Sequence, residues 1–341
     1  MGLKKWMLML ILAFALTGCG RTELPEETPV PEAAAETVQE TLALEDVYVD
    51  AVELQIAEDS REEVIMEEAP EPAIPDILEP VASGERTEET EKVLIDYSHT
   101  EDGYIMVLYK EESTKKLKAQ IRGLTTTYTY TLYAGQWAVF PLTDGNGTYQ
   151  VKIFQNISGN QYSLVTAASM EVALSDEFAP FLRPNQYVNY AASSKAVEKG
   201  LELTKDVEGT LNKVQAVYEF VVSELHYDEE KARTVRSGYV PVLDTVLEEK
   251  KGICFDYASL MTGMLRSQGI PCKMVFGYAG SAYHAWISVW TEESGWVDGV
   301  IFFDGIAWQR LDPTFASSSE RSENVMKFIG NGKNYREKYF Y

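Results

Sequence analysis

The chain has 341 residues, of which 45% are hydrophobic, and a formal net charge of −23. No basic patch stands out from this acidic background, so the composition argues against a nucleic-acid partner. Residues 93–341 carry little of the charge and are numerous enough for more than one folded domain.

Residues 1–18 have the pattern of a signal peptide. Two lysines precede an apolar run over residues 6–16, which is too short for a comfortable membrane span. The run ends in LTGC at residues 16–19, which resembles the bacterial lipoprotein box. In proteins with that box the signal is cut before the cysteine, which then carries the lipid. We therefore expect lipidation at Cys19 and an extracytoplasmic, membrane-anchored protein; the alternative is an ordinary signal peptide with an incidental cysteine.

Residues 19–92 form an acidic, proline-rich stretch. Between residues 21 and 92, 23 acidic residues stand against 4 basic ones, and seven of the thirteen prolines occur there. Such a segment cannot bury enough apolar surface to offset the entropy lost on ordering, and its like charges extend it. We expect a disordered tether; an acidic tail that binds cations or basic partners is the alternative.

Residues 93–176 favour β-strands. Tyr128, Tyr130 and Leu132 alternate with threonines, as on a half-buried strand, and the run over residues 147–156 repeats the alternation after a DGNG turn. About seven short strands at this spacing predict an immunoglobulin-like β-sandwich. It contains no catalytic cluster, so we interpret it as a spacer or a substrate-docking module.

After residue 177 the hydrophobic period changes to that of helices. We expect helices over residues 191–204 and 210–225, and a third that runs from Cys254 toward Gly269. Strand-like runs follow at 272–279, 283–290, 295–303 and 307–314. Helices followed by a sheet predict an α+β domain over residues 177–341. Its end, from residue 317 onward, could cover a cleft, dock on the sandwich or hang free.

Cys254 has several possible roles. A disulfide to Cys272 is disfavoured, because the intervening helix would separate its ends by about 15 Å, beyond disulfide reach. The sequence lacks the usual zinc-ligand spacings, so we expect neither a metal nor another cofactor. Cys272 begins an apolar run and reads as a small core residue. Core packing of Cys254 stays open as an alternative to catalysis.

The context of Cys254 suits a nucleophile. It lies at a helix start, where backbone N–H groups favour an anionic sulfur. His284, in a predicted strand, could transfer the protons, and Asp312, on a neighbouring strand, could orient the imidazole. We interpret Asp256 as a first-turn carboxylate that stabilises the start of the helix.

Residues 205–315 resemble the core of the transglutaminase-like superfamily. The resemblance rests on KGICFDYASLMTGMLRSQGIPCKMVFGY, YHAWISVW, GWVDG and LDPTF. It implies a papain-like fold with Cys254 as nucleophile, His284 as base and acid, Asp312 as orienting residue and no metal. Members often carry a tyrosine near the position of Tyr227, so this residue is expected to border the site. Trp286 and Trp308 either line a substrate groove or pack in the core.

The resemblance implies acyl transfer through a thioester. Water as second nucleophile would make the protein a cysteine peptidase or amidase, and a lysine amine would make it a transglutaminase. Because most bacterial members are thought to be hydrolases, we expect hydrolysis of protein or peptide amides first, possible substrates including cell-wall peptides. The second hypothesis is a transglutaminase that cross-links proteins. The third is a catalytically inactive scaffold protein that binds partners in the cell envelope.

Overall fold

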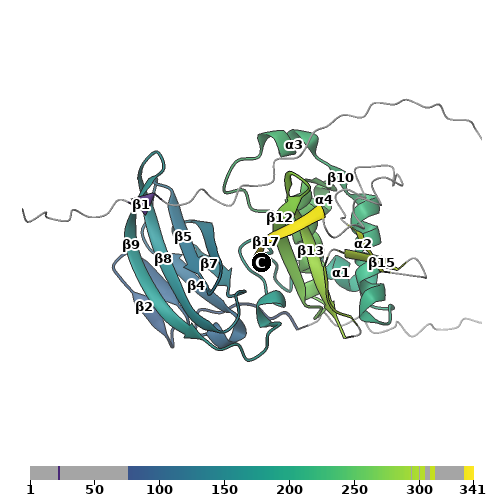
Figure 1. Ribbon diagram of the computed structural model, residues 1–341, viewed down its shortest axis with the longest axis horizontal. Helices are drawn as coiled ribbons and strands as arrows, with labels where there is room; N and C mark the ends of the chain where they lie inside the picture. Colours follow the sequence, from purple (N-terminus) through teal and green to yellow (C-terminus); the bar gives the residue numbers. More distant parts are fainter. Residues whose placement is uncertain (1–21, 24–75, 293, 299, 304–307, 312–333) are drawn as a thin grey trace, which may run out of the picture.

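The computed structural model describes residues 22–23 and 76–341, apart from residues 293, 299, 304–307 and 312–333. A β-sheet region lies beside a C-terminal unit of helices and strands (Figure 1). The chain is therefore α+β, as the sequence predicts.

The β-sheet region contains two antiparallel sheets. One has the order β1-β9-β8-β5-β6 and comprises β1 (Thr22–Glu23), β5 (Leu117–Arg122), β6 (Thr127–Leu132), β8 (Gly147–Ser158) and β9 (Gln161–Val172). The other has the order β2-β3-β4-β7 and comprises β2 (Thr87–Glu89), β3 (Val93–Asp96), β4 (Tyr104–Tyr109) and β7 (Trp137–Pro141). Two 3₁₀ turns are η1 (Thr100–Asp102) and η2 (Ala179–Phe181).

The alternation seen in the sequence marks the core of this region. Tyr128, Tyr130 and Leu132 in β6 are buried, and they share one hydrophobic core with residues of the other sheet such as Ile95 and Val107. Strand β2 lies within the range expected to be tether and pairs with β3. The specific assignment to an immunoglobulin-like sandwich stays a prediction.

The C-terminal unit begins with helices. These are α1 (Lys195–Thr204), α2 (Thr210–Glu224), α3 (Glu229–Thr234), α4 (Leu243–Glu249) and α5 (Cys254–Arg266). The predicted helices correspond to α1, α2 and α5, with α1 starting at Lys195 rather than at residue 191. Helices α3 and α4 were not predicted.

The strands of this unit form a four-stranded sheet and two smaller pairings. The sheet has the order β14-β13-β12-β17, with β12 (Cys272–Ala279), β13 (Ala282–Thr291), β14 (Gly295–Asp298) and β17 (Tyr335–Phe340). The short strands β10 (His226–Tyr227) and β11 (Lys251–Gly252) pair in parallel, and β15 (Val300–Phe303) pairs with β16 (Trp308–Leu311).

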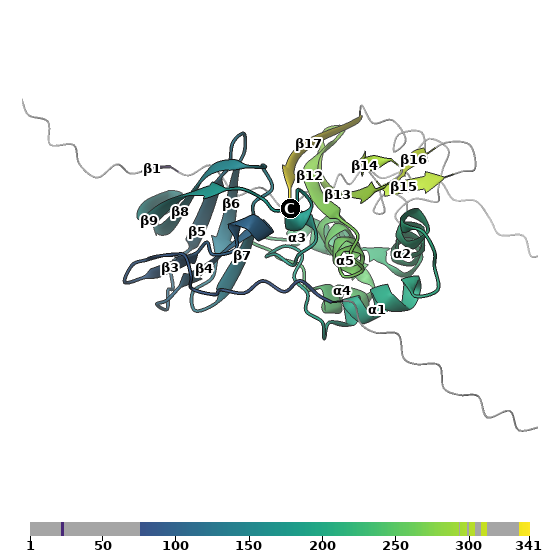
Figure 2. The same cartoon turned by 90° about the horizontal axis from the view of Figure 1, so that it is seen from below.

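Helix α5 is the centre of this unit. All of its residues are buried, and it packs against β12 and β13 on one side and against α1, α2 and α4 on another (Figure 2). A helix that is covered all round holds its ends firmly in place. The position of Cys254 at its first residue is therefore fixed by the core.

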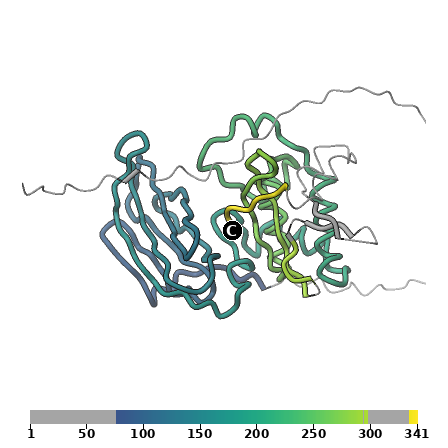
Figure 3. The backbone as a smooth tube through the Cα atoms, in the orientation of Figure 1, coloured from purple at the N-terminus to yellow at the C-terminus, as the bar shows by residue number. Residues whose placement is uncertain are grey.

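Tyr341 joins the two units. Its backbone N–H and carbonyl exchange hydrogen bonds with Met274 in β12. Its ring contacts Tyr128 of the β-sheet region and both Tyr187 and Phe276 of the C-terminal unit, at centroid distances between 4.8 and 5.6 Å. The chain end lies between the units in the backbone trace (Figure 3). The described part of the segment from residue 317 onward thus extends the sheet and docks on the β-sheet region.

The described residues include no helix that is both long enough and apolar enough to cross a membrane. The predicted signal peptide and Cys19 lie outside these residues.

Candidate active site

Cys254 begins α5 directly after the short strand β11. The preceding residue, Ile253, is extended, and Cys254 is 2% exposed. Parallel pairing of β10 with β11 places Tyr227 opposite Gly252, two residues before the cysteine. The chain thus carries Tyr227 close to the start of α5, and its role at the site stays a prediction.

Asp256 fixes the start of α5. Its Oδ2 accepts the backbone N–H of Ile253 at 2.8 Å and lies 2.7 Å from Nζ of Lys231. Its Oδ1 accepts the hydroxyl of Tyr239 at 2.5 Å. This fully buried carboxylate accepts a hydrogen bond from a backbone N–H that would otherwise be unpaired at the helix start. Its negative charge is balanced by Lys231. The interpretation of Asp256 as a helix-start residue is confirmed.

Two tyrosines flank Cys254. Burial raises the pKa of the Tyr227 phenol, and a charge on the nearby Cys254 sulfur raises it further. Burial also raises the pKa of Tyr283, with smaller contributions from neighbouring tyrosines and Cys254. Both phenols therefore stay protonated near neutral pH, so either can serve as a hydrogen-bond donor but not as a base.

His284 lies in β13, next to Tyr283 and opposite Gly277 of β12. Its side chain is 6% exposed and stacks on Trp286, with ring centroids 6.3 Å apart. Side chains alternate along a strand, so His284 and Trp286 share one face of the sheet and Tyr283 points from the other. Trp286 covers Gly277, where a Cβ atom would lie 2.7 Å from the indole.

The strand pairing brings Tyr227 beside Gly252, two residues before Cys254, and His284 stacks on Trp286. Helix α5 packs on β12 and β13 from the face that carries Met274 and Tyr283, whereas His284 lies on the opposite face of the sheet. Trp286 is 1% exposed, so in this structure it packs beside His284 rather than forming an open groove wall.

The remaining predicted site residues are only partly described. Trp308 begins β16, and Asp312, one residue past that strand, lies outside the described residues. Cys272 is fully buried, and neither it nor Cys254 forms a disulfide. Three or more possible metal-binding side chains do not cluster anywhere in the described part of the chain.

Sequence reasoning missed Lys231, Tyr239 and Tyr283. Lys231 and Tyr239 precede Asp256 in a segment whose sequence has no helical or strand periodicity. Tyr283 adjoins His284, and it could have been noted as an aromatic of the same strand. For the other two residues no local signal exists, because only the fold brings them to the carboxylate.

Residues 198–299 match the model of the transglutaminase-like superfamily. The chain contains a transglutaminase-like domain. The match includes Cys254 and His284 and ends before Asp312.

Two curated proteins resemble part of this chain. The uncharacterized protein YebA of Bacillus subtilis is 30% identical over 116 residues, which are 28% of this chain and 16% of that protein. The protein-glutamine gamma-glutamyltransferase of Pseudomonas aeruginosa is 30% identical over 105 residues, 27% of this chain and 14% of that enzyme. The chain thus matches only about a sixth of the length of these two relatives.

A solved structure, the periplasmic domain of TgpA from Pseudomonas aeruginosa bound to ethylmercury, is similar at 20% sequence identity. The alignment covers 69% of this chain and 77% of that one, with a TM-score of 0.31.

Proposed function

We propose that the protein is a thiol-dependent acyl-transfer enzyme of the transglutaminase-like superfamily, acting first as a cysteine peptidase or amidase. The observation that supports this most is the position of Cys254, a buried cysteine at the first residue of a buried helix whose start is held by Asp256. In this proposal His284 is base and acid, and Asp312 orients its imidazole.

The reaction would begin when His284 takes the thiol proton and the Cys254 sulfur attacks an amide carbonyl carbon. The carbonyl electrons move to oxygen, and the backbone N–H of Cys254, at the helix start, is a donor for that oxyanion. His284 then gives the proton to the departing amine, which leaves a thioester. Water, deprotonated by His284, would release the acid and restore the thiol.

The proton transfer between sulfur and imidazole is the step on which this proposal most depends. Helix α5, which begins with Cys254, packs on β13, which carries His284. Catalytic hydrogen bonds of unliganded enzymes are often long and shorten when substrate binds. The proton would therefore pass to His284 in the complex with substrate.

A second candidate is transfer of the acyl group to an amine. It is supported by the name of one relative, a protein-glutamine gamma-glutamyltransferase. The similarity to that enzyme covers 27% of this chain. The two reactions share the thioester and differ in whether water or an amine accepts the acyl group.

We further propose that the enzyme acts outside the cytoplasm, held to the bacterial membrane through lipid on Cys19. The support is the sequence of residues 1–19 and the acidic, proline-rich stretch after it. Protein or peptide amides, including cell-wall peptides, would then be the accessible substrates.

Thiol labelling tests the nucleophile. We expect a chloroacetamide probe to label the full chain at Cys254, the label to disappear in Cys254→Ala, and Cys272→Ala to keep it as the matched control. His284→Ala should slow the labelling by about tenfold or more, which is the size expected when a proton acceptor is lost. Labelling of Cys254 no faster than that of an ordinary exposed thiol would instead favour the inactive scaffold.

A glutamine-containing peptide and a primary amine separate the two reactions. Both reactions release ammonia when the thioester forms, and hydrolysis further predicts that the glutamine becomes glutamate to the same extent with or without the amine. Incorporation of the amine faster than net hydrolysis would favour the transglutaminase reading.

A further inference from the structure

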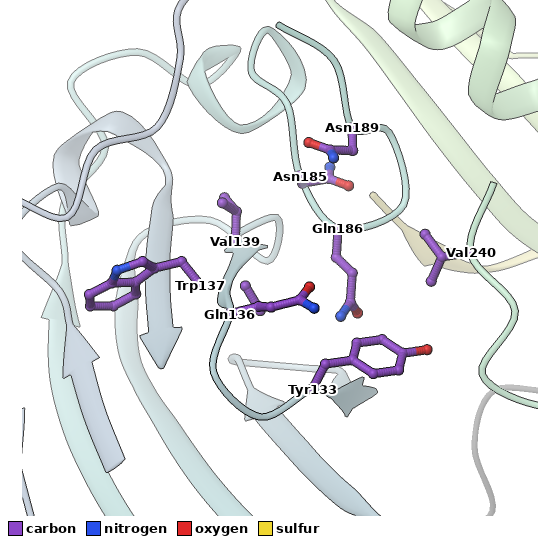
Figure 4. Close-up of a pocket in the computed structure, with 9 residues that line it drawn as sticks. Tyr133, Gln136, Trp137, Val139, Asn185, Gln186, Asn189 and Val240 are labelled. Carbon is purple, nitrogen blue, oxygen red and sulfur yellow. The ribbon is translucent and has the colours of Figure 1, made fainter. Parts of the chain in front are cut away.

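A pocket of about 190 Å³ lies where the β-sheet region meets the C-terminal unit. The β-sheet region contributes the loop from Tyr133 to β7, and the C-terminal side contributes residues 185–189 and Val240. In Figure 4 the side chains of Gln136 and Gln186 reach toward each other from these two parts. The pocket holds none of the residues that we place in the proposed reaction.

Asn185, which lines this pocket, has an unused hydrogen-bond donor. The residue is 3% exposed, and its Oδ1 accepts the backbone N–H groups of Tyr187 and Val188 at 2.9 and 3.1 Å. These two bonds fix which end of the amide is oxygen. Nδ2 is then left buried and has no partner among the described residues. Leaving a buried donor unpaired is unfavourable.

Gln186 presents the complementary acceptor. Its Nε2 donates to the carbonyl of Thr131 at 2.7 Å, so the other end of the amide is the oxygen. This Oε1 is also buried and unpaired within the described part of the chain. Two consecutive lining residues thus carry a donor and an acceptor that are both buried and have no partner among the described residues.

The other lining groups define the ligand further. No lining residue is acidic or basic, so the site has no charge with which to bind an ionic ligand. The ring of Tyr133 is 45% exposed and is held by a hydrogen bond from its hydroxyl to the carbonyl of Gly238 at 2.9 Å. It provides a preorganised apolar surface beside the amides.

An added peptide strand is disfavoured at this place. Strand β7 is at the edge of its sheet, but the carbonyl of Val139 already accepts the N–H of Gln186 at 3.1 Å. A peptide therefore cannot pair along this edge in the usual way.

We propose that this pocket binds a neutral saccharide. A sugar hydroxyl both donates and accepts, so adjacent hydroxyls can satisfy Asn185 Nδ2 and Gln186 Oε1 together, with Gln136 and Asn189 as further amide partners. The C–H face of the sugar ring packs on Tyr133. The small volume fits one ring of a longer chain, whose remainder would extend into solvent.

The test uses the full chain and three trisaccharides, built from N-acetylglucosamine, from β-linked glucose and from α-linked glucose. Binding is followed by saturation-transfer NMR of the sugar and by the side-chain amide signals of the protein. We expect saturable binding of at least one sugar with a dissociation constant of about 1 mM or tighter, and a shift of the Asn185 and Gln186 amide signals.

Variants locate the binding. Tyr133→Ala should weaken it by about tenfold or more, a single lost ring contact being worth about 1.4 kcal/mol, whereas Tyr133→Phe keeps the ring and should bind nearly as the parent. Asn185→Asp keeps the oxygen that accepts the two backbone N–H groups and removes only the donor, so it should also weaken binding. Ile157→Ala, an exposed residue of the β-sheet region outside the pocket, is the control.

Three results would overturn the proposal. They are no saturable binding of any of the sugars at about 10 mM, ten times the weakest expected dissociation constant; binding that Tyr133→Ala and Asn185→Asp leave unchanged; and binding of acetyl-dialanine amide, an uncharged peptide, in place of the sugars.

Discussion

At the start of α5, Asp256 fills the space beside Gly252 that any side chain at position 252 would need. A Cβ atom on residue 252 would lie 2.5 Å from Cβ of Asp256 and 2.9 Å from its Oδ2. The glycine two positions before Cys254 is therefore required by the carboxylate of the first helical turn. Together the two residues set the position at which α5 begins, and they therefore also set the position of Cys254.

Gly252→Ala should displace Asp256 and break its bond to the N–H of Ile253. We expect a loss of about 1–3 kcal/mol in the free energy of unfolding, as for other overpacked core positions, and slower labelling of Cys254 because its helix start moves. Urea unfolding and thiol labelling of the same samples check both. Unchanged stability would show that the chain accommodates the methyl group and that the contact is not restrictive.

Asp256→Ala should cost more than Tyr239→Phe. The first substitution leaves the N–H of Ile253 and the ammonium of Lys231 without their shared carboxylate and should cost about 3 kcal/mol. The second removes only the hydroxyl that donates to Oδ1 and should cost about 1 kcal/mol. Urea denaturation orders the two variants, and equal losses would contradict the role given to the charge pair.

Tyr341→Ala should loosen the contact between the two units. The ring is fully buried among aromatic residues of both, so its removal leaves a cavity and should cost about 3–5 kcal/mol. Faster proteolysis of residues 173–194, which link the units, would accompany the loss.

Tyr341→Phe is the matched control. The Tyr341 hydroxyl is buried and has no partner among the described residues, so its removal should leave stability unchanged or raise it. A large loss in this variant would show that the hydroxyl has a bonding role.

Cys272 should make stability fall at high pH. Burial raises the pKa of its thiol from 9.0 to about 12, while the buried Arg266 nearby lowers it by less. The folded state therefore favours the neutral thiol. Its contribution is complete below pH 9 and is lost as the pH rises toward 12.

The measurement compares unfolding of the parent and of Cys272→Ala at pH 8 and pH 10.5. The parent should lose on the order of 2 kcal/mol more between these pH values. Buried tyrosines such as Tyr130 add a decline of the same sign in both proteins, so only the difference reports on the thiol. Parallel declines would show that Cys272 does not ionise in this range.

Part of this fold is encoded by residues that are neighbours in the sequence. The spacing of apolar residues predicts α2, and the alternation around Tyr130 predicts β6. The glycine turn before Cys254 and the apolar run around His284 place one on a helix start and the other on a strand. These patterns work because the periods of helix and strand are local properties of the backbone.

Which distant segments meet depends on the complete fold and cannot be read from any one segment. Short helices such as α3 and α4 lack enough turns to show a period, and they form because the rest of the unit covers them. The pairing of β10 with β11, the approach of Lys231 to Asp256 and the insertion of Tyr341 between the units join residues whose sequence neighbours give no sign of the contact. Their partners are selected by packing and by the need to satisfy buried charges and hydrogen bonds, which depend on the whole fold rather than on any one segment.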